Sequence, residues 1–372
     1  MKEVVVVGGD PGGAMALAPV LRALQLHPDI RLRVFGYRQA FTLWLRQGLD
    51  VEALPDDRAV DPIEFVRDDA VALLLTATSV NGVDHERSFR RWASWASVAS
   101  VAVLDFWSNY SARFRNGSNG VLELPSAIAI MDARAHSEMV AEGFPAERLV
   151  VTGQPAFDAI ETFRAAWSET KRREARKRLS VEMGCKAVLF VSQPLSEMAW
   201  LTGSVGAAID EREILDRVAA SLEEIAATDA TEIVLAVRPH PRQQLEQSDL
   251  PSGSHVRVML AANGEPWPAV LAADVVVGMT SVLLVEACLL GCTVVSVQPG
   301  GNATDPLPTS RSGDSVAVYD VAELTGALRR ALAPALATKC ARSANSANRR
   351  VAADHIVELV LMTMANQGAR NE

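Results

Sequence analysis

The sequence is poor in aromatic residues, which make up 5% of its 372 residues, and it contains only 4 cysteines. The cysteines form no CxxC pair and show no spacing with histidine that would suit a metal site. Cys288 and Cys292 lie four residues apart in an apolar run, as two residues on one helix face do. We therefore expect reduced core cysteines and no bound metal.

Long hydrophobic runs are also missing. No apolar stretch reaches the roughly 18 to 20 residues that a membrane-spanning helix needs, so no integral membrane segment is expected. The first apolar strand begins directly after Met1 and Lys2, which leaves no space for a signal peptide. Together these absences predict a cytoplasmic protein.

An excess of positive charge is absent as well. The formal net charge is −9, whereas binding to a nucleic-acid backbone needs a basic surface. Nucleic acid is therefore not expected as a partner, and any phosphate-binding site must be local.

The sequence lacks the two common phosphate-binding loops. Residues 8–13 read Gly-Gly-Asp-Pro-Gly-Gly, which is not GxGxxG, and no Lys-Ser/Thr follows as in a Walker loop. Dinucleotide oxidoreductases and P-loop ATPases therefore lose support. Glycines still let a backbone approach a ligand closely. Gly9, Gly12 and Gly13 are thus candidate ligand-binding residues, and a tight strand-to-helix turn is the alternative.

The sequence does contain a regular alternation of apolar strands and amphipathic helical segments, which predicts parallel sheets with helices on both faces. The chain is too long for one comfortable core. We expect an α/β protein with an N-terminal domain at 1–167, a C-terminal domain at 180–343 and a last helix at 344–372 that returns to the first domain. Strands are expected at residues 4–7, 32–35, 70–75, 100–104, 127–131 and 149–151, and at 187–191, 232–237, 256–260, 274–277, 293–297 and 316–319.

One strand of the second half ends in residues suited to an anion. Arg238 and His240 follow the strand expected at 232–237. Pro239 and Pro241 exclude helix there, so the two donors are presented from a stiff extended turn. Such a turn suits a diphosphate.

Another strand leads into a helix whose start carries two hydroxyls, those of Thr280 and Ser281. The free N–H groups of a helix start attract an anion without a metal, although a plain N-cap is the alternative. Glu286 lies in the apolar helical stretch that follows, where a carboxylate must be solvated, paired or used. We expect it to accept hydrogen bonds from ribose hydroxyls.

Two acidic residues of the first half are candidate general bases. Asp10 lies in the glycine-rich loop, and Asp105 directly follows the strand at 100–104. Open parallel sheets bind ligands beyond the carboxyl ends of their strands, where both residues are expected. Thr78-Ser79 and Glu86 follow a neighbouring strand and are expected to share that rim.

These motifs resemble those of the GT-B glycosyltransferase superfamily, which includes the hydrolysing UDP-N-acetylglucosamine 2-epimerases and the CDP-glycerol glycerophosphotransferases. The likeness rests on the glycine-rich loop, the segment 153–158, the Arg-Pro-His-Pro turn and the Thr-Ser helix start with Glu286. Residues 188–195 are also similar to the opening of the C-terminal domain in bacterial sialyltransferase- and polysialyltransferase-like proteins.

The resemblance implies two Rossmann-like domains facing across a cleft, with the acceptor on the N-terminal side and the nucleotide held by the C-terminal domain. It also implies which residues act in the site. The nucleotide-sugar-binding residues would be Gly9, Gly12, Gly13, Gln193, Arg238, His240, Thr280, Ser281 and Glu286, and the catalytic residues would be Asp10, Asp105 and His240.

The reaction implied is transfer of a sugar from a nucleotide-sugar donor of UDP or CMP type to an acceptor hydroxyl, in the synthesis of a glycan or glycoconjugate. Stabilising the departing phosphate is its main task. No Asp-x-Asp loop is evident, so neither Mg²⁺ nor a cofactor is expected. The alternatives are a nucleotide-sugar hydrolase or 2-epimerase, and a catalytically idle nucleotide-sugar-binding scaffold. The apolar stripe of the last helix serves either the core or a homodimer.

Overall fold

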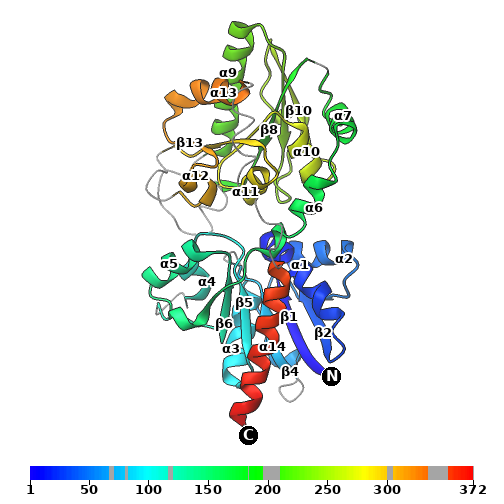
Figure 1. The fold of residues 1–372 in the computed structure, drawn as a ribbon, viewed down its shortest axis with the longest axis vertical. Coiled ribbons are helices and arrows are strands. Elements are labelled where there is room, and N and C mark those ends of the chain that lie inside the picture. The colour runs from blue at the N-terminus through cyan, green and yellow to red at the C-terminus, as the bar shows by residue number, and fades with distance from the viewer. Residues whose placement is uncertain are drawn as a thin grey trace. The chain divides into compact units, whose positions relative to one another are not determined.

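The structure of the chain is a computed structural model that describes residues 1–66, 71–79, 83–115, 120–182, 184–195, 210–299, 305–333 and 351–371. The chain divides into two compact units. Unit 1 comprises Met1–Asp158 and Asn348–Glu372, and unit 2 comprises Ala159–Ala347. Each unit contains its own β-sheet with helices on both sides (Figure 1).

Unit 1 is a doubly wound α/β unit. Its strands are β1 (Lys2–Gly8), β2 (Ile30–Gly36), β3 (Glu52–Ala53), β4 (Val71–Thr76), β5 (Ser100–Val103), β6 (Ala127–Ile130) and β7 (Leu149–Val151). Its helices are α1 (Pro11–Gln25), α2 (Arg38–Arg46), α3 (His85–Trp95), α4 (Tyr110–Phe114), α5 (Ala133–Ala141) and α14 (Ala352–Asn371). The sheet order is β3-β2-β1-β4-β5-β6-β7, with each neighbouring pair parallel. The strand order therefore reverses between β1 and β4.

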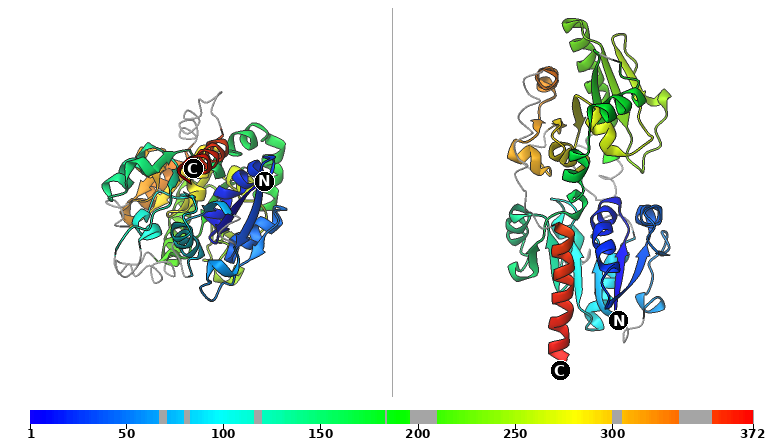
Figure 2. Two further views of the ribbon diagram at one scale, coloured as in Figure 1. Left: turned by 90° about the horizontal axis from the view of Figure 1, so that it is seen from below. Right: turned by 45° about the vertical axis from the view of Figure 1, so that its right-hand side comes forward.

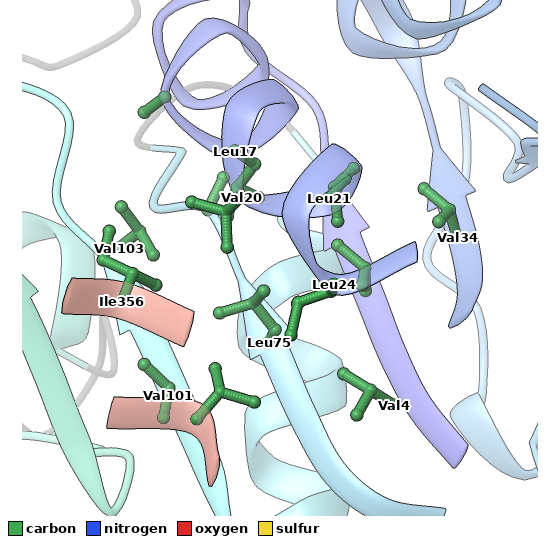
Figure 3. Close-up of a cluster of buried hydrophobic side chains, with 14 of the residues drawn as sticks. Val4, Leu17, Val20, Leu21, Leu24, Val34, Leu75, Val101, Val103 and Ile356 are labelled. Atoms are coloured by element: carbon green, nitrogen blue, oxygen red, sulfur yellow. The ribbon is translucent and has the colours of Figure 1, made fainter. Parts of the chain in front are cut away.

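The sheet of unit 1 is buried on both faces because its strands consist of β-branched and other apolar residues. Val4 and Val6 belong to a cluster with residues of α1, α2 and α14, whereas Val5 and Val7 pack with residues of α3. Figure 3 shows the first cluster, with Ile356 of α14 beside Val101 and Val103 of β5 and with α1 above Leu75 and Val4.

Helix α14 completes unit 1 although it ends the chain. It contacts α1 and the strands β4, β5 and β6, and it runs along these strands in Figures 1 and 2. The carboxylate of Asp158 accepts hydrogen bonds from the backbone N–H groups of Ala352 and Ala353, each at 2.9 Å, which satisfies two of the free donors of the helix start. The predicted return of the last helix is confirmed. Residues 344–350, which the sequence assigns to the same helix, lie outside the described residues.

Unit 2 is a second doubly wound unit. Its strands are β8 (Lys186–Val191), β9 (Ile233–Arg238), β10 (Val256–Leu260), β11 (Val275–Gly278), β12 (Thr293–Val297) and β13 (Val316–Val318). Its helices are α6 (Ile160–Ala165), α7 (Glu169–Arg178), α9 (Glu211–Asp229), α10 (Pro266–Ala272), α11 (Val282–Leu289), α12 (Pro308–Ser312) and α13 (Leu324–Leu332). The order is β10-β9-β8-β11-β12-β13, again parallel throughout. The strand order reverses between β8 and β11.

Helices cover both faces of this second sheet. Residues of α9 and α13 pack on one face in a cluster that includes Val188 and Phe190 of β8. Helices α10 and α11 contact the sheet as well, and α10 contacts α7. The charged helix α7 is anchored by Arg172 and Arg176, whose guanidinium groups lie 2.9 and 3.2 Å from the carboxylate of Asp274.

The α/β architecture of two Rossmann-like units predicted from the sequence is confirmed. Each predicted strand is present, with bounds that differ by at most two residues at either end, and within the described residues only the two-residue strand β3 was not predicted. Within the described ranges, no helix is both long and apolar enough to cross a membrane.

Candidate functional site

In unit 2, the sequence-predicted residues gather at the carboxyl end of the sheet. Gln193 follows β8, Arg238 and His240 lie at the end of β9, and Thr280 and Ser281 follow β11. These three strands are adjacent in the sheet, and the reversal of strand order lies between β8 and β11. Doubly wound sheets bind ligands at such a reversal.

Gln193 and Thr280 join the ends of β8 and β11. The side-chain oxygen of Gln193 accepts a hydrogen bond from the backbone N–H of Thr280 at 2.8 Å. Ser281 is the N-cap of α11, and its Oγ accepts from the N–H of Leu283 at 3.3 Å. The capping role considered for Ser281 is therefore present, and Gln193 fixes the loop that leads into the helix.

Arg238 has an unusual environment for a cation. Its Nη2 donates to the carbonyl oxygen of Gly264 at 2.9 Å, while its buried Nη1 has no hydrogen-bond partner among the described residues. Burial lowers the pKa of this guanidinium. An unpaired buried N–H costs free energy in the ligand-free protein. An anionic ligand that accepts a hydrogen bond from Nη1 would remove this cost.

His240 is held as a neutral imidazole beside Arg238. Its Nδ1 accepts a hydrogen bond from the backbone N–H of Arg242 at 3.2 Å. Burial, and to a lesser degree the charge of Arg242, lowers the pKa of His240 to about 4. The proton of the neutral ring is therefore on Nε2, which can donate to a ligand.

Glu286 lies on α11 and is held by an indole. Its Oε2 accepts a hydrogen bond from Nε1 of Trp267 at 2.7 Å. Burial raises the pKa of Glu286 to about 7, and the hydrogen bond from Trp267 opposes this increase. Within the described part of the chain, Oε1 forms no hydrogen bond and is the oxygen left for a ligand.

In unit 1, the buried carboxyl group of Glu86 lies at the carboxyl edge of the sheet, where the strand order reverses between β1 and β4. Its Oε1 accepts from the backbone N–H of Gly9 at 3.1 Å and from the hydroxyl of Ser79 at 2.7 Å, and its Oε2 accepts from the hydroxyl of Tyr37. The N–H of Gly9, which could otherwise face a phosphate, is thus occupied by the protein's own acid.

The three candidate glycines of unit 1 are closely packed. A Cβ on Gly9 would lie 2.2 Å from the Tyr37 ring, and one on Gly13 would lie 2.5 Å from the Cβ of Ala77. A Cβ on Gly12 would lie 2.2 Å from Oδ2 of Asp105. Packing within unit 1 is therefore sufficient to explain why glycine stands at these positions.

Asp105 is fixed at the carboxyl end of β5. Its Oδ1 forms an ion pair of 2.6 Å with Arg113, which also donates to the carbonyl oxygen of Thr78 at 2.5 Å. The Nε2 group of Gln154 donates to the backbone oxygen of Asp105 at 2.8 Å. The side chain of Asp105 is 13% exposed, and among the described residues its Oδ2 has no hydrogen-bond partner. This oxygen could accept a proton from a substrate hydroxyl.

Asp10, the second candidate base, lies in the loop before α1. Its carboxylate forms an ion pair of 3.3 Å with Arg38. Arg38 also donates to the carbonyl oxygen of Val83 at 2.9 Å. Asp10, Asp105 and the expected neighbours Thr78, Ser79 and Glu86 thus lie at the carboxyl edge of one sheet.

Sequence reasoning missed several residues of these sites, such as Arg38, which pairs with Asp10. Tyr37 and Trp267 hold the carboxyl groups of Glu86 and Glu286, and Arg242 fixes the tautomer of His240. Arg242 acts through its backbone N–H, which any residue except proline supplies, so its basic side chain gave no signal for this contact. Tyr37 and Trp267 gave no signal either, because their partners are far away in the sequence.

We expect the substitution Glu86→Gln to flatten the dependence of stability on pH. Burial, with a smaller contribution from the charge of Asp84, raises the pKa of Glu86 from 4.5 to about 7. Between these values, the folded protein holds a proton that the unfolded chain has released. The free energy of unfolding therefore falls as the pH rises through this window, by about 3 kcal/mol at most. Urea unfolding at several pH values would measure this slope.

Glutamine keeps an oxygen that can accept from Gly9 and Ser79, but it does not ionise. Some slope should remain in the variant, because the raised pKa of Glu286 acts in the same direction. Equal slopes for the two proteins would show that Glu86 does not titrate on unfolding in this window.

The described ranges contain no group of three or more His, Cys, Asp or Glu side chains that could hold a metal ion. No protein-family model and no curated protein matches the chain. Solved structures do match. UDP-GlcNAc 2-epimerase from Neisseria meningitidis, bound to UDP-GlcNAc, superimposes with a TM-score of 0.71 at 16% identity and covers 97% of this chain and 100% of its own.

Two further solved structures are similar over the same share of both chains, 97% of this chain and 100% of theirs. They are UDP-GlcNAc 2-epimerase from Methanocaldococcus jannaschii, with a TM-score of 0.62 at 13% identity, and MurG from Acinetobacter baumannii, with a TM-score of 0.55 at 14% identity. At these identities the likeness establishes the fold, which is the GT-B fold that the sequence motifs predicted.

Proposed function

We propose that the chain is an enzyme that acts on a nucleotide sugar and transfers the sugar to an acceptor hydroxyl without a metal ion. The observation that carries the proposal is the buried, unpartnered Nη1 of Arg238. It lies at the carboxyl edge of a doubly wound sheet, two strands from the start of α11. The guanidinium group of Arg238 and the start of α11 both attract phosphate. The 2-epimerase from Neisseria meningitidis, which has the same fold, is bound to UDP-GlcNAc, and this favours a UDP-sugar as the donor.

In the proposed reaction, unit 2 holds the donor. Arg238, the neutral His240 and the N-terminal turn of α11 after Ser281 would stabilise the charge that develops on the departing phosphate. Glu286 would accept from the ribose. A hydrogen-bond donor and a fixed positive charge can serve this role in place of a divalent cation.

In the same proposal, unit 1 supplies the base. Asp105 would take the proton of the acceptor hydroxyl through Oδ2, while the ion pair with Arg113 keeps the carboxylate oriented. Asp10 is the second candidate, and its carboxylate, like that of Asp105, is paired with an arginine, Arg38.

Hydrolysis or 2-epimerisation of a nucleotide sugar is the second candidate function. It is favoured by the closer structural match to the 2-epimerase from Neisseria meningitidis than to MurG, with TM-scores of 0.71 and 0.55. The same donor site serves both reactions, because they differ in what attacks or deprotonates the sugar.

A thermal-shift panel of UDP, CMP, CDP, GDP, dTDP and their sugar conjugates, with and without Mg²⁺, tests the proposal. A ligand that binds only the native state raises the melting temperature, and we expect a metal-independent shift with a uridine nucleotide. Release of UDP from the sugar conjugate is then followed with and without acceptor alcohols. Release that requires an acceptor supports transfer, and release without one supports hydrolysis. A conjugate that keeps its UDP but whose sugar changes configuration supports 2-epimerisation, and binding with neither change supports an idle scaffold. No shift with any nucleotide would refute the proposed function.

A further inference from the structure

Trp267 is not part of any motif in the sequence, yet it holds the one carboxylate in the helix that starts at the proposed phosphate site. Its Nε1 donates to Oε2 of Glu286 at 2.7 Å, across from α10 to α11. Every other residue of α11 is Leu, Val, Ala or Cys, so the helix is otherwise apolar. A carboxylate in such surroundings keeps one orientation only if a specific donor holds it.

The indole of Trp267 is itself fixed. Proline stands on both sides of it, at Pro266 and Pro268, in the first turn of α10, where the proline ring presets helical φ. The ring of Phe163, on α6, packs edge-on against the indole with centroids 5.1 Å apart and planes at 70°. Phe163 in turn stacks on Trp167, with centroids 5.8 Å apart. The N–H of Trp267 therefore points at Glu286 because backbone and packing both constrain the ring.

With Oε2 taken by the indole, the orientation of the carboxylate fixes the position of Oε1. We propose that Trp267 is a positioning residue that holds Glu286 so that Oε1 accepts a hydrogen bond from the ribose 2′-hydroxyl, and that Phe163 supports this arrangement from α6. The site then prefers a ribonucleotide to its 2′-deoxy counterpart. This inference rests on the proposed nucleotide-sugar function.

The N–H of Trp267 also favours the charged form of Glu286, which is the better acceptor. The pKa of Glu286 is already raised to about 7 by burial, and the indole opposes that increase. Removing the N–H leaves a carboxyl group that is more often protonated and free to rotate about its side-chain bonds. Both changes weaken a hydrogen bond to ribose without affecting the phosphate contacts.

The test compares the dissociation constants of UDP and 2′-deoxy-UDP, measured by isothermal titration calorimetry, for the wild type and for Trp267→Phe. The wild type is expected to bind UDP about tenfold more tightly than the deoxy form, the ratio that one hydrogen bond to a charged group provides. Trp267→Phe keeps the ring but loses the N–H, so its ratio should fall to about one. Glu286→Gln should show the same loss.

Trp95→Phe is the control, because Trp95 is an exposed tryptophan of α3 in unit 1 and lies outside the aromatic cluster of Phe163, Trp167 and Trp267. Its preference for UDP should equal that of the wild type. If Trp267→Phe does not fold, Phe163→Leu, which removes the supporting ring and keeps the indole, should lower the preference in part.

Three results would overturn the inference. An unchanged preference in Trp267→Phe would show that the N–H does not position Glu286. A wild type that binds both nucleotides equally would show that Glu286 does not contact the 2′-hydroxyl. A wild type that binds neither would instead refute the proposed function on which the inference rests.

Discussion

Replacing Asp105 by asparagine is expected to lower turnover by about 10²- to 10⁴-fold, the contribution of a positioned general base. Asparagine has the same shape and keeps an oxygen that can accept from Arg113, but it cannot take a proton at Oδ2. The affinity for the nucleotide should stay unchanged, because the proposed donor residues all belong to unit 2. Steady-state kinetics together with nucleotide titration would separate the two effects.

Gly12→Ala offers an independent test of the same carboxylate. Its Cβ would lie 2.2 Å from Oδ2 of Asp105, so the side chain must move away from its position against Arg113. Turnover should therefore fall although every catalytic group is present. Gly326→Ala is the control, since the nearest atom to that Cβ is a terminal nitrogen of Arg330, at 3.3 Å. Wild-type turnover in Asp105→Asn would exclude Asp105 as the base and leave Asp10 as the candidate.

Replacing Arg238 by alanine is expected to weaken nucleotide binding by about 10- to 100-fold, as the loss of charge-assisted hydrogen bonds to phosphate does. The free protein should not lose stability in proportion. It loses one hydrogen bond to Gly264 but also a buried N–H group without a partner. A melting temperature that stays level while affinity falls is typical of a residue kept for binding rather than for folding.

Arg217→Ala is a suitable control for this experiment. Arg217 forms an exposed ion pair with Glu213 on α9, and its removal should change neither affinity nor stability much. If Arg238→Ala binds UDP as the wild type does, the phosphate site must be sought elsewhere in the chain.

The fold was readable from the sequence because its strands are short, apolar and rich in valine, and because helical segments separate them. Strand β3 escaped prediction because its two residues are exposed and follow no apolar pattern. Helix α7 is a run of charged residues, and such a run gives no sign that Arg172 and Arg176 anchor it on Asp274.

The residues of the site could be predicted from the sequence only where they belong to one continuous motif. Arg238 and His240 stand in one turn, and Ser281 directly precedes its helix, so their shared edge of the sheet could be inferred. The contacts that fix them could not. The pairing of Gln193 with Thr280 depends on β8 and β11 being neighbours in the sheet. The two residues are 87 positions apart in the chain. The environment of Glu86 likewise draws on three separate loops.

The division of the chain also sets the order in which its parts are completed during synthesis. Unit 2 is one continuous stretch, whereas unit 1 needs α14, which follows unit 2 in the chain. On the ribosome, the sheet of unit 1 emerges first, and α1 and α2 can cover part of one apolar face. The part over β4, β5 and β6 is completed only when Ile356, Val360 and Met364 of α14 arrive. Unit 2 can therefore finish folding before unit 1 does. A premature stop ahead of α14 would leave an intact second unit attached to an unfinished, aggregation-prone first one.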